Sequence, residues 1–163
     1  MRLTRLWTPD PPGLLELWKH EGPRTVRAFT FFNDRDLAFR PQPGARSIGE
    51  LQGHLVQSYS LTRHWLLHET SPVPQLASIP GSISESLRLL RIAQATLYSL
   101  LSETQPEQLD TEIAPFGVLE TRGVMAFGML KHELHHRGEL HALARVRGRS
   151  VCNLYDPVED EAL

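Results

Sequence analysis

Prolines and glycines divide this sequence into long proline-free stretches, and that punctuation constrains the fold more than any other feature. Proline removes a backbone donor and clashes inside a helix, so clusters of Pro and Gly predict where helices end. The longest proline-free stretches cover about residues 47–69, 82–103 and 121–147, each long enough for about six or more helical turns. None shows a run of alternating apolar and polar residues, the pattern of half-buried strands. The chain is therefore predicted to be all-α.

Capping signals mark where these helices begin and end. Ser47 precedes Glu50 by three residues, and Ser82 precedes Glu85 by the same interval. In such a capping box, the serine oxygen accepts a hydrogen bond from the first turn and the glutamate accepts one from the serine N–H. Gly148 is the predicted stop of the last helix, because glycine readily adopts the left-handed conformation of a helix C-terminus.

The N-terminal region is predicted to be more broken. Because proline suits a first helical turn, Gly22-Pro23 would separate a short helix at 14–21 from a second at 23–33. Loops are predicted at 40–44, 71–81 and 106–117. The whole pattern predicts an all-α four-helix bundle, up-and-down or with a crossover connection, with a short N-terminal helical segment.

Length and composition predict one globular domain over residues 1–163. The chain is 40% hydrophobic and 22% charged, which excludes a disordered chain, a collagen-like repeat and a disulfide scaffold. The core is expected at about 14–148, and residues 149–163 form an acidic tail. A net charge of −2 without a basic stripe predicts no nucleic-acid partner and no anionic membrane surface.

The remaining compositional signals concern localisation. Cys152 is the single cysteine, so no internal disulfide can form and a reducing cytoplasm is expected. No stretch of apolar residues is long enough to span a bilayer. The N-terminus also has no apolar run of secretory length before its prolines.

Histidines carry most of the functional information, because the chain has eight and four of them fall within residues 132–141. At about 100° per helical residue, His136 lies about 40° from His132 and Glu139 about 20° to the other side. These three side chains therefore share one face. Two histidines spaced i, i+4 can bind one cation, since neutral imidazole is a ligand for Zn, Ni, Cu or Fe. His54, expected on the core face of an earlier helix, is the best candidate for a third ligand.

The other residues of this region fit a metal site less well. His135 and His141 are predicted to be polar surface residues, His64 and His68 to be peripheral, and His20 to lie in the broken N-terminal segment. Arg137 points away from the histidine face and is predicted to form a structural or interface ion pair. A simpler alternative for the i, i+4 pair is two histidines satisfied by hydrogen bonds, with no metal.

The string from His132 to His136 also matches H-E-x-x-H, the helix motif of zinc peptidases. In that interpretation Glu133 would be the general base. The longer metzincin form fails, because its glycine and third histidine would each be displaced by one residue here. A distant carboxylate ligand would have to be Asp156 or Glu159, both in the acidic tail. A peptidase is therefore a remote alternative.

Two segments resemble the DinB-like (damage-inducible, DinB/YfiT-like) four-helix family. One is HELHHRGELH at 132–141, followed by LARVRG at 143–148. The other is FRPQPGARSIGEL at 39–51, which leads into GHL at 53–55. The resemblance spans about residues 14–148. It implies a four-helix bundle that binds a divalent metal through three histidines, one from the second bundle helix and an H-x-x-x-H pair from the last.

By this resemblance the metal ligands are His54, His132 and His136, with Zn²⁺ as the first choice and Ni²⁺, Mn²⁺ or Fe²⁺ as alternatives. The family commonly has glutamine where this chain has Glu139. A carboxylate there could be a fourth ligand, a hydrogen-bond partner of a ligand, or a catalytic proton acceptor.

The resemblance also implies an activity. Some relatives activate a low-molecular-weight thiol, such as bacillithiol or mycothiol, and transfer it to an electrophile. The implied function is a metal-dependent thiol S-transferase that acts on a small-molecule substrate in stress response or detoxification. A metal-binding stress protein without catalytic turnover is the alternative, so enzyme activity stays open at this stage.

A second apolar stripe on the last helix, formed by Phe127, Leu130 and Leu134, lies on the side away from the histidines. A helix that is apolar on two faces is usually covered on both. The stripe could pack against the N-terminal segment around Leu14 and Trp18. It could also form a homodimer interface, which the family resemblance favours.

Overall fold

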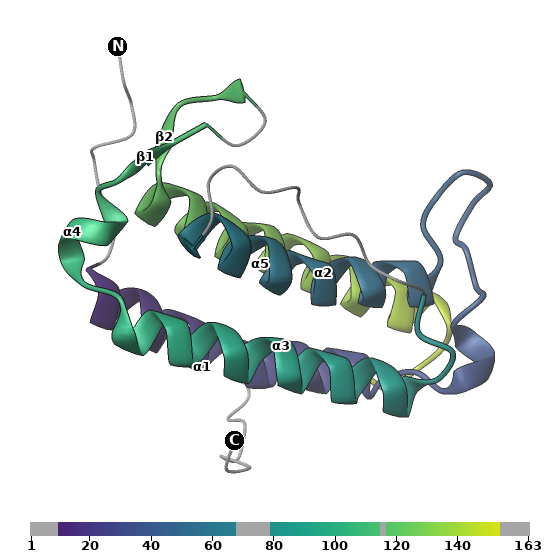
Figure 1. The fold of residues 1–163 in the computed structure, drawn as a ribbon. Coiled ribbons are helices and arrows are strands. Elements are labelled where there is room, and N and C mark those ends of the chain that lie inside the picture. Colours follow the sequence, from purple (N-terminus) through teal and green to yellow (C-terminus); the bar gives the residue numbers. More distant parts are fainter. Residues whose placement is uncertain (1–9, 68–78, 115–116, 154–163) are drawn as a thin grey trace.

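Four long helices in two layers make up the computed structural model, which describes residues 10–67, 79–114 and 117–153 (Figure 1). They are α1 (Pro11–Phe29), α2 (Ile48–Leu67), α3 (Ile83–Glu103) and α5 (Arg122–Val146). α1 and α3 form one layer, and α2 and α5 form the other. The all-α four-helix prediction is therefore confirmed.

The helix directions decide between the two predicted topologies. α1 and α5 run in one direction, whereas α2 and α3 run in the other (Figure 1). Side-chain contacts agree, because the Arg122 guanidinium at the start of α5 donates to the Leu66 carbonyl at the end of α2, at 2.9 Å. Since the consecutive helices α2 and α3 are parallel, the bundle has the crossover form and not the up-and-down form.

α1 is one continuous helix, so the prediction of two short helices separated at Gly22-Pro23 is wrong. Three side chains from neighbouring helices donate to carbonyls around the proline: Tyr98 to Trp18 at 2.9 Å, Arg137 to Glu21 at 3.0 Å and Gln94 to Gly22 at 3.1 Å. These bonds tie the turns on either side of Pro23 to α3 and α5. Gly22 is required here for space, because a Cβ atom would lie 2.0 Å from the Tyr98 hydroxyl.

The predicted helix starts are confirmed by their caps. Ser47 Oγ accepts from the Glu50 N–H at 3.2 Å, and the Glu50 carboxylate accepts from the Ser47 N–H at 2.7 Å, which completes the box. Ser82 Oγ accepts from the Glu85 N–H at 3.1 Å. The Glu85 carboxylate, however, accepts from the Gly81 N–H at 2.8 Å, one residue earlier than a capping box requires.

The segments that flank α5 contain one predicted and two unpredicted features. Gly148 ends the helix as predicted, with a φ of +66°. Before α5, where a loop was predicted, the chain forms the short helix α4 (Pro106–Leu109) and a hairpin of β1 (Glu112–Ile113) and β2 (Glu120–Thr121). These elements are too short to produce a periodic pattern in the sequence.

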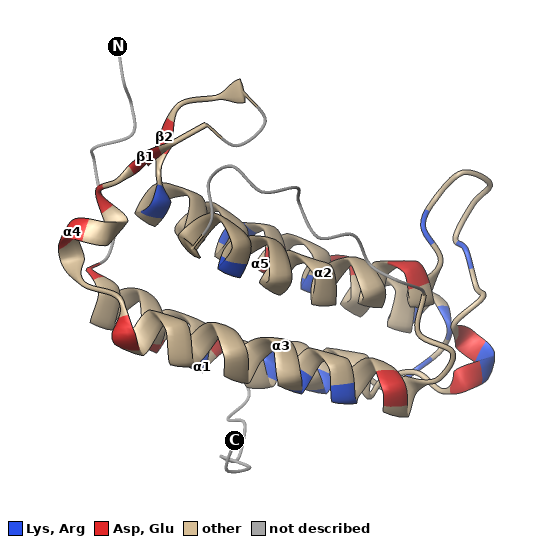
Figure 2. Cartoon of the chain, viewed as in Figure 1, with Lys and Arg blue, Asp and Glu red and all other residues tan. Residues whose placement is uncertain are grey.

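Hydrophobic side chains from all four long helices fill the space between the layers. The largest fully buried ones include Trp18, Phe29, Leu55, Leu90 and Leu140. Acidic and basic residues are interspersed along the described helices (Figure 2). No described helix combines the length and hydrophobicity needed to cross a membrane. His68 and the acidic residues of the predicted tail lie outside the described residues.

A buried carboxylate near the C-terminal end of α5 fixes the 3₁₀ turn Asp34–Asp36 to that helix. Asp36 is fully buried, and its two oxygens accept from the guanidinium groups of Arg147 and Arg149. Burial raises the pKa of Asp36, but hydrogen bonds from the Asn33 N–H and from the two arginines outweigh it and hold this pKa below its usual value. Asp36 is therefore ionised and paired at neutral pH.

Candidate metal centre

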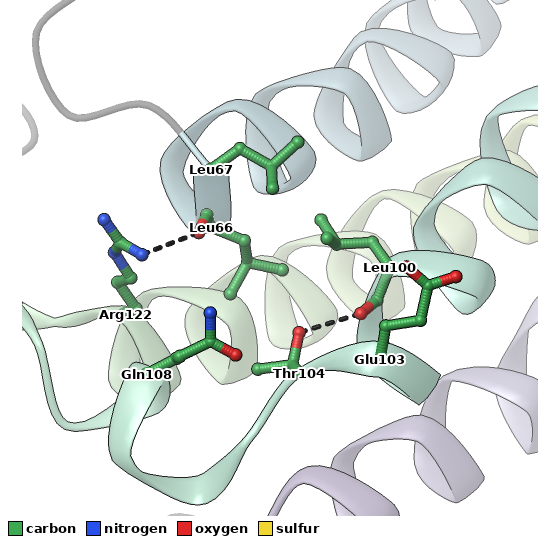
Figure 3. Close-up of a pocket in the computed structure, with 7 residues that line it drawn as sticks. All are labelled: Leu66, Leu67, Leu100, Glu103, Thr104, Gln108 and Arg122. Carbon is green, nitrogen blue, oxygen red and sulfur yellow. Dashed lines mark hydrogen bonds between the residues drawn. The ribbon is translucent and has the colours of Figure 1, made fainter.

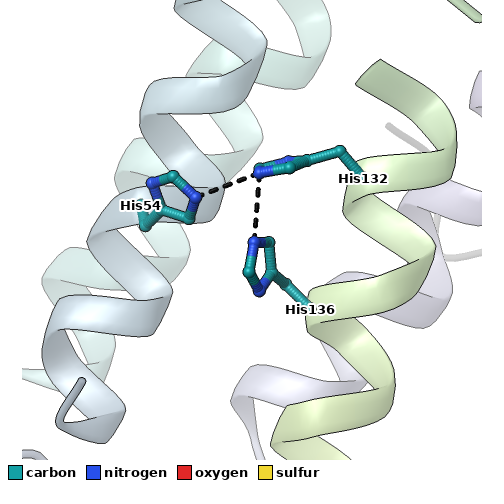
Figure 4. Close-up of side chains that lie close together, drawn as sticks. All are labelled: His54, His132 and His136. Atoms are coloured by element: carbon teal, nitrogen blue, oxygen red, sulfur yellow. Dashed lines mark hydrogen bonds between the residues drawn. The ribbon is translucent and has the colours of Figure 1, made fainter. Parts of the chain in front are cut away.

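Three histidines from two antiparallel helices meet at the interface of α2 and α5 (Figure 4). His54 lies in the second turn of α2, and His132 and His136 lie one turn apart on α5. The Nε2 atom of His132 is 3.0 Å from that of His54 and 3.0 Å from that of His136. The structure thus brings together the three residues predicted as metal ligands, and we refer to them as the histidine triad.

The spacing within the triad is close to that of a metal site. The potential ligand atoms of the three side chains all lie within 4.8 Å of one another. Tetrahedral zinc bonds of about 2.0–2.1 Å separate neighbouring ligand atoms by about 3.3 Å. The observed 3.0 Å between Nε2 atoms is slightly shorter, so a small opening of the rings would admit an ion.

Hydrogen bonds to the other ring nitrogen orient two of the histidines. His136 Nδ1 is 2.7 Å from a carboxylate oxygen of Glu139, and His132 Nδ1 is 3.2 Å from the Ser58 hydroxyl. A carboxylate only accepts hydrogen bonds, so the proton of a neutral His136 lies on Nδ1 and the lone pair on Nε2. This is the usual arrangement around a histidine that binds a metal.

Electrostatics keep two of the triad histidines in the form that binds a metal. Burial, the nearby Arg46 charge and the other histidines lower the pKa of His54 to about 4. Burial and His136 chiefly lower the pKa of His132 to about 4 as well. Both rings are therefore neutral at pH 7, and neutral imidazole is the metal-binding form.

Glu139 lies at the exposed edge of this site. Partial burial raises its pKa, but the hydrogen bond and charge of His136 outweigh burial and hold it below its usual value. The second carboxylate oxygen is 3.3 Å from the Nε2 atom of His135, which is exposed as predicted. Its ligand atom groups with those of His135 and His136, and not with those of all three triad histidines. The structure thus favours its role as a hydrogen-bond partner of His136 over that of a fourth ligand.

Ser58 is the site residue that sequence analysis missed. It lies one turn after His54 on α2 and is 1% exposed. Residues four apart on a helix share a face, so the spacing could have identified it. A serine is common on helices, however, and nothing in the sequence indicates that it reaches His132 on another helix.

Glu133 is rotated by about 100° around α5 from His132 and faces the core. Its side chain is fully buried, and Oε1 accepts from the Tyr59 hydroxyl at 2.7 Å and from the Thr25 hydroxyl. Gln94 donates in turn to the Tyr59 oxygen at 3.0 Å. Burial raises the pKa of Glu133 to about 7, although these hydrogen bonds oppose the shift. We refer to Thr25, Tyr59, Gln94 and Glu133 as the Glu133 cluster.

Two predictions about nearby residues have different outcomes. His141 was expected at the surface, which is wrong, because it is 4% exposed and its ring packs edge-on against Phe31. Phe31 follows α1 in the chain, and the sequence does not reveal that it reaches this face of α5. Arg137 forms the predicted structural ion pair, with Glu21 at 2.5 Å. His64 is buried in α2 and lies outside the triad.

The second apolar stripe of α5 is only partly covered. Leu130 is buried in the core, Phe127 is partly buried, and Leu134 is 37% exposed. The Lys131 ammonium lies 5.3 Å from the centre of the Phe127 ring. The stripe is thus divided between the core and the surface.

A separate pocket of about 220 Å³ lies near the other end of α2 (Figure 3). Its lining residues are Leu66, Leu67, Leu100, Glu103, Thr104, Gln108 and Arg122. None of these described lining residues is a histidine. Leu66 follows His54 by twelve residues on α2, which corresponds to about 18 Å along the helix axis. The pocket is therefore not part of the triad.

Three solved structures share this fold. A DinB-like protein from Bacillus cereus has 21% identity and a TM-score of 0.81, covering 91% of this chain and 100% of its own. The DinB-like protein YjoA from Bacillus subtilis has 21% identity and a TM-score of 0.75, with 87% and 96% covered. YfiT from Bacillus subtilis, described as having an unusual four-helix bundle topology, has 17% identity and a TM-score of 0.70, with 86% and 89% covered.

Sequence comparison adds the family. No curated protein sequence matches the chain. The sequence model of the DinB superfamily, in contrast, matches residues 17–140, a region that includes His54, His132 and His136. Since this match covers most of the sequence and the fold agrees with it, the chain belongs to the DinB superfamily.

Proposed function

We propose that this protein is a divalent-metal-dependent enzyme, with His54, His132 and His136 as the metal ligands. The convergence of three Nε2 atoms at the α2–α5 interface carries this proposal. Their hydrogen bonding supports it, because Glu139 and Ser58 engage the Nδ1 atoms of two rings and leave Nε2 for a metal. YfiT is described as a probable metal-dependent hydrolase, which is consistent with a metal in this fold.

Zinc is the metal that this ligand set suits best. Three histidines provide three of the four positions of a tetrahedral site, and the fourth is left for water or substrate. Two of the three rings are only half-buried, so a small molecule can approach the triad from solvent. Nickel, manganese and iron are alternatives, since imidazole also binds other transition metals.

Thiol transfer is the reaction that we propose for this site. A bound divalent ion lowers the pKa of a coordinated thiol or water and so supplies a nucleophile at neutral pH. The positive charge of Arg46, which also lowers the pKa of His54 and His132, favours a thiolate over a neutral thiol here. The proposed substrates are a low-molecular-weight thiol, such as bacillithiol, and a small electrophile. The role would be in stress response or detoxification.

The alternatives have weaker support. A zinc peptidase of the H-E-x-x-H type needs its glutamate beside the metal-bound water, whereas Glu133 lies in the core with Tyr59 and Thr25. A metal-binding protein without turnover would be favoured by a fourth protein ligand. Glu139 instead contacts the Nδ1 atom of His136, on the side of the ring away from the other triad nitrogens.

Metal analysis tests the site first. We expect about one divalent ion per chain in tag-free protein by elemental mass spectrometry, and none in His54→Ala. His20→Ala is the matched control, because His20 is an exposed histidine on α1 that belongs to neither group of candidate ligands. Wild-type protein without metal, or His54→Ala with unchanged metal, would contradict the proposed site.

Activity is the second test. The metal-loaded protein is incubated with bacillithiol or mycothiol and a panel of electrophiles, and thiol consumption is measured. We expect turnover that is absent in His54→Ala. Stoichiometric metal without thiol consumption for any electrophile would leave the metal site intact and contradict the transferase.

We also propose that the protein forms a homodimer through the exposed part of the stripe at Phe127 and Leu134. Light scattering coupled to gel filtration measures the mass directly. The expected mass is twice the 18.5 kDa of one chain. Leu134→Lys is expected to give the single-chain mass, because a buried charge without a partner is costly.

A further inference from the structure

Ser58 connects the two helices that carry the histidine triad. Its side chain is buried at the α2–α5 interface, where Oγ lies 2.9 Å from the His54 carbonyl oxygen and 3.2 Å from His132 Nδ1. The first contact is the usual bond of a helical serine to the carbonyl one turn earlier. The second reaches another helix and a proposed metal ligand.

The direction of these hydrogen bonds follows from the number of protons. A hydroxyl has one proton, and the His54 carbonyl can only accept, so Ser58 donates that proton to the carbonyl. Toward His132 the Ser58 oxygen must then accept. His132 therefore carries its proton on Nδ1, and its lone pair lies on Nε2, beside the Nε2 atoms of His54 and His136.

The two histidines of α5 thus have partners of different kinds. His136 is held by Glu139, which is exposed and charged. His132 is held by Ser58, which is buried, neutral and fixed by the backbone of α2. A buried partner with both hydrogen bonds in place has few alternative positions, so it orients the ring more strictly than an exposed side chain does.

We propose that Ser58 is a positioning residue that fixes the tautomer and ring orientation of His132 for metal binding. It acts through His132 and does not itself touch the metal. This inference rests on the proposed metal site. A partner of this kind typically contributes 10- to 100-fold to metal affinity.

Ser58→Ala and Thr62→Val make a matched pair for the test. Thr62 lies one turn further along α2, is equally buried, and donates to the Ser58 carbonyl at 2.8 Å. It makes the same kind of backbone bond as Ser58 and has no bond to a histidine among the described contacts. Zinc affinity is measured by competition with a chromophoric chelator on the full chain, after circular dichroism shows that each variant is folded.

We expect zinc binding about 10- to 100-fold weaker in Ser58→Ala and unchanged in Thr62→Val. Nitrogen-15 NMR of the histidine rings in zinc-free protein provides a second readout. His132 should carry its proton on Nδ1 in the wild type and show a mixture of tautomers in Ser58→Ala.

The outcomes separate this inference from the proposed function. Wild-type protein that binds no zinc would overturn the metal site. An unchanged zinc affinity in folded Ser58→Ala, or an unchanged His132 tautomer in that variant, would overturn the role of Ser58 even when the wild type binds zinc.

Discussion

His132 and Glu133 are adjacent in the sequence, yet they belong to two polar groups with opposite properties. His132 is half-buried and points with His54 and His136 toward a shared point near solvent. Glu133 is fully buried, and hydroxyls of Tyr59 and Thr25 donate to it. In the histidine triad, the Nε2 lone pairs face a shared position, and none of the described contacts places a protein donor there. In the Glu133 cluster, the carboxylate accepts hydrogen bonds from hydroxyl groups of the protein.

The comparison shows that the roles of His132 and Glu133 depend on which side of α5 each residue faces, and not on their shared H-E-x-x-H motif. Successive residues on α5 are rotated by about 100°. His132 therefore faces α2 at the exposed edge of the interface, and Glu133 faces the core. The pKa values follow this division. Burial and positive neighbours lower the pKa of His132 to about 4, and burial raises that of Glu133 to about 7. We therefore expect the triad to determine metal binding and the cluster to determine stability.

The largest effect should come from the triad. His132→Ala removes the ligand whose Nε2 lies 3.0 Å from both other ligands, so zinc affinity should fall by well over 100-fold, more than loss of a ligand's outer partner costs. The free energy of unfolding of the zinc-free protein should change little, because the ring is half-buried. Chelator competition and urea unfolding measure the two quantities. If His132→Ala instead lost much of its zinc-free stability and still bound zinc, the triad would determine stability and not metal binding, which would contradict the proposal.

The converse change is Glu133→Ala. It leaves the hydroxyls of Tyr59 and Thr25 without their buried acceptor and creates a cavity, so the free energy of unfolding should fall by about 3–4 kcal/mol. The zinc affinity of the folded fraction should stay close to that of the wild type. A variant as stable as the wild type would show that the cluster does not hold the bundle together.

The pH dependence of stability sharpens the same comparison. Because the pKa of Glu133 is about 7 in the folded chain and near 4.5 when unfolded, its contribution is complete below about pH 4.5 and is lost as the pH rises through 7. Between pH 5 and 8, zinc-free wild type should lose on the order of 2–3 kcal/mol relative to Glu133→Gln, which cannot titrate. Urea unfolding of both proteins at the two pH values measures this difference. Parallel pH profiles would contradict the raised pKa.

Glu139 should give the smallest effect. Glu139→Gln keeps an oxygen that can accept from His136 Nδ1 but removes the charge, so we expect zinc affinity to fall by about 10-fold. Glu139→Ala removes the acceptor as well and should cost more. If Glu139→Gln lost as much affinity as His132→Ala, Glu139 would be a direct ligand, and the description of the triad as a three-histidine site would be wrong.

Much of the architecture was predictable because its signals are local. Ser47 and Ser82 mark helix starts through contacts within one turn, and Gly148 marks a helix end through its own φ angle. The i, i+4 spacing of His132 and His136 likewise requires only the geometry of one helix. Local geometry does not depend on the rest of the fold, so the sequence predicts it well.

Two failed predictions involve contacts from elsewhere in the fold. α1 continues through Pro23, where Gln94, Tyr98 and Arg137 bond carbonyls of the flanking turns from α3 and α5. His141 is buried, with its ring against Phe31, which follows α1. In both cases the deciding partner is far away in the chain, and no local pattern indicates its approach.

By itself, the sequence determined the last three long helices, most of their ends and the shared face of His132, His136 and Glu139, since each depends on backbone geometry over a few turns. Only the tertiary structure decided that α2 and α3 run parallel, that Glu133 enters the core, and that Ser58 meets His132. The reason is physical: packing and hydrogen bonds between helices are set by the whole arrangement, which brings together residues 74 positions apart.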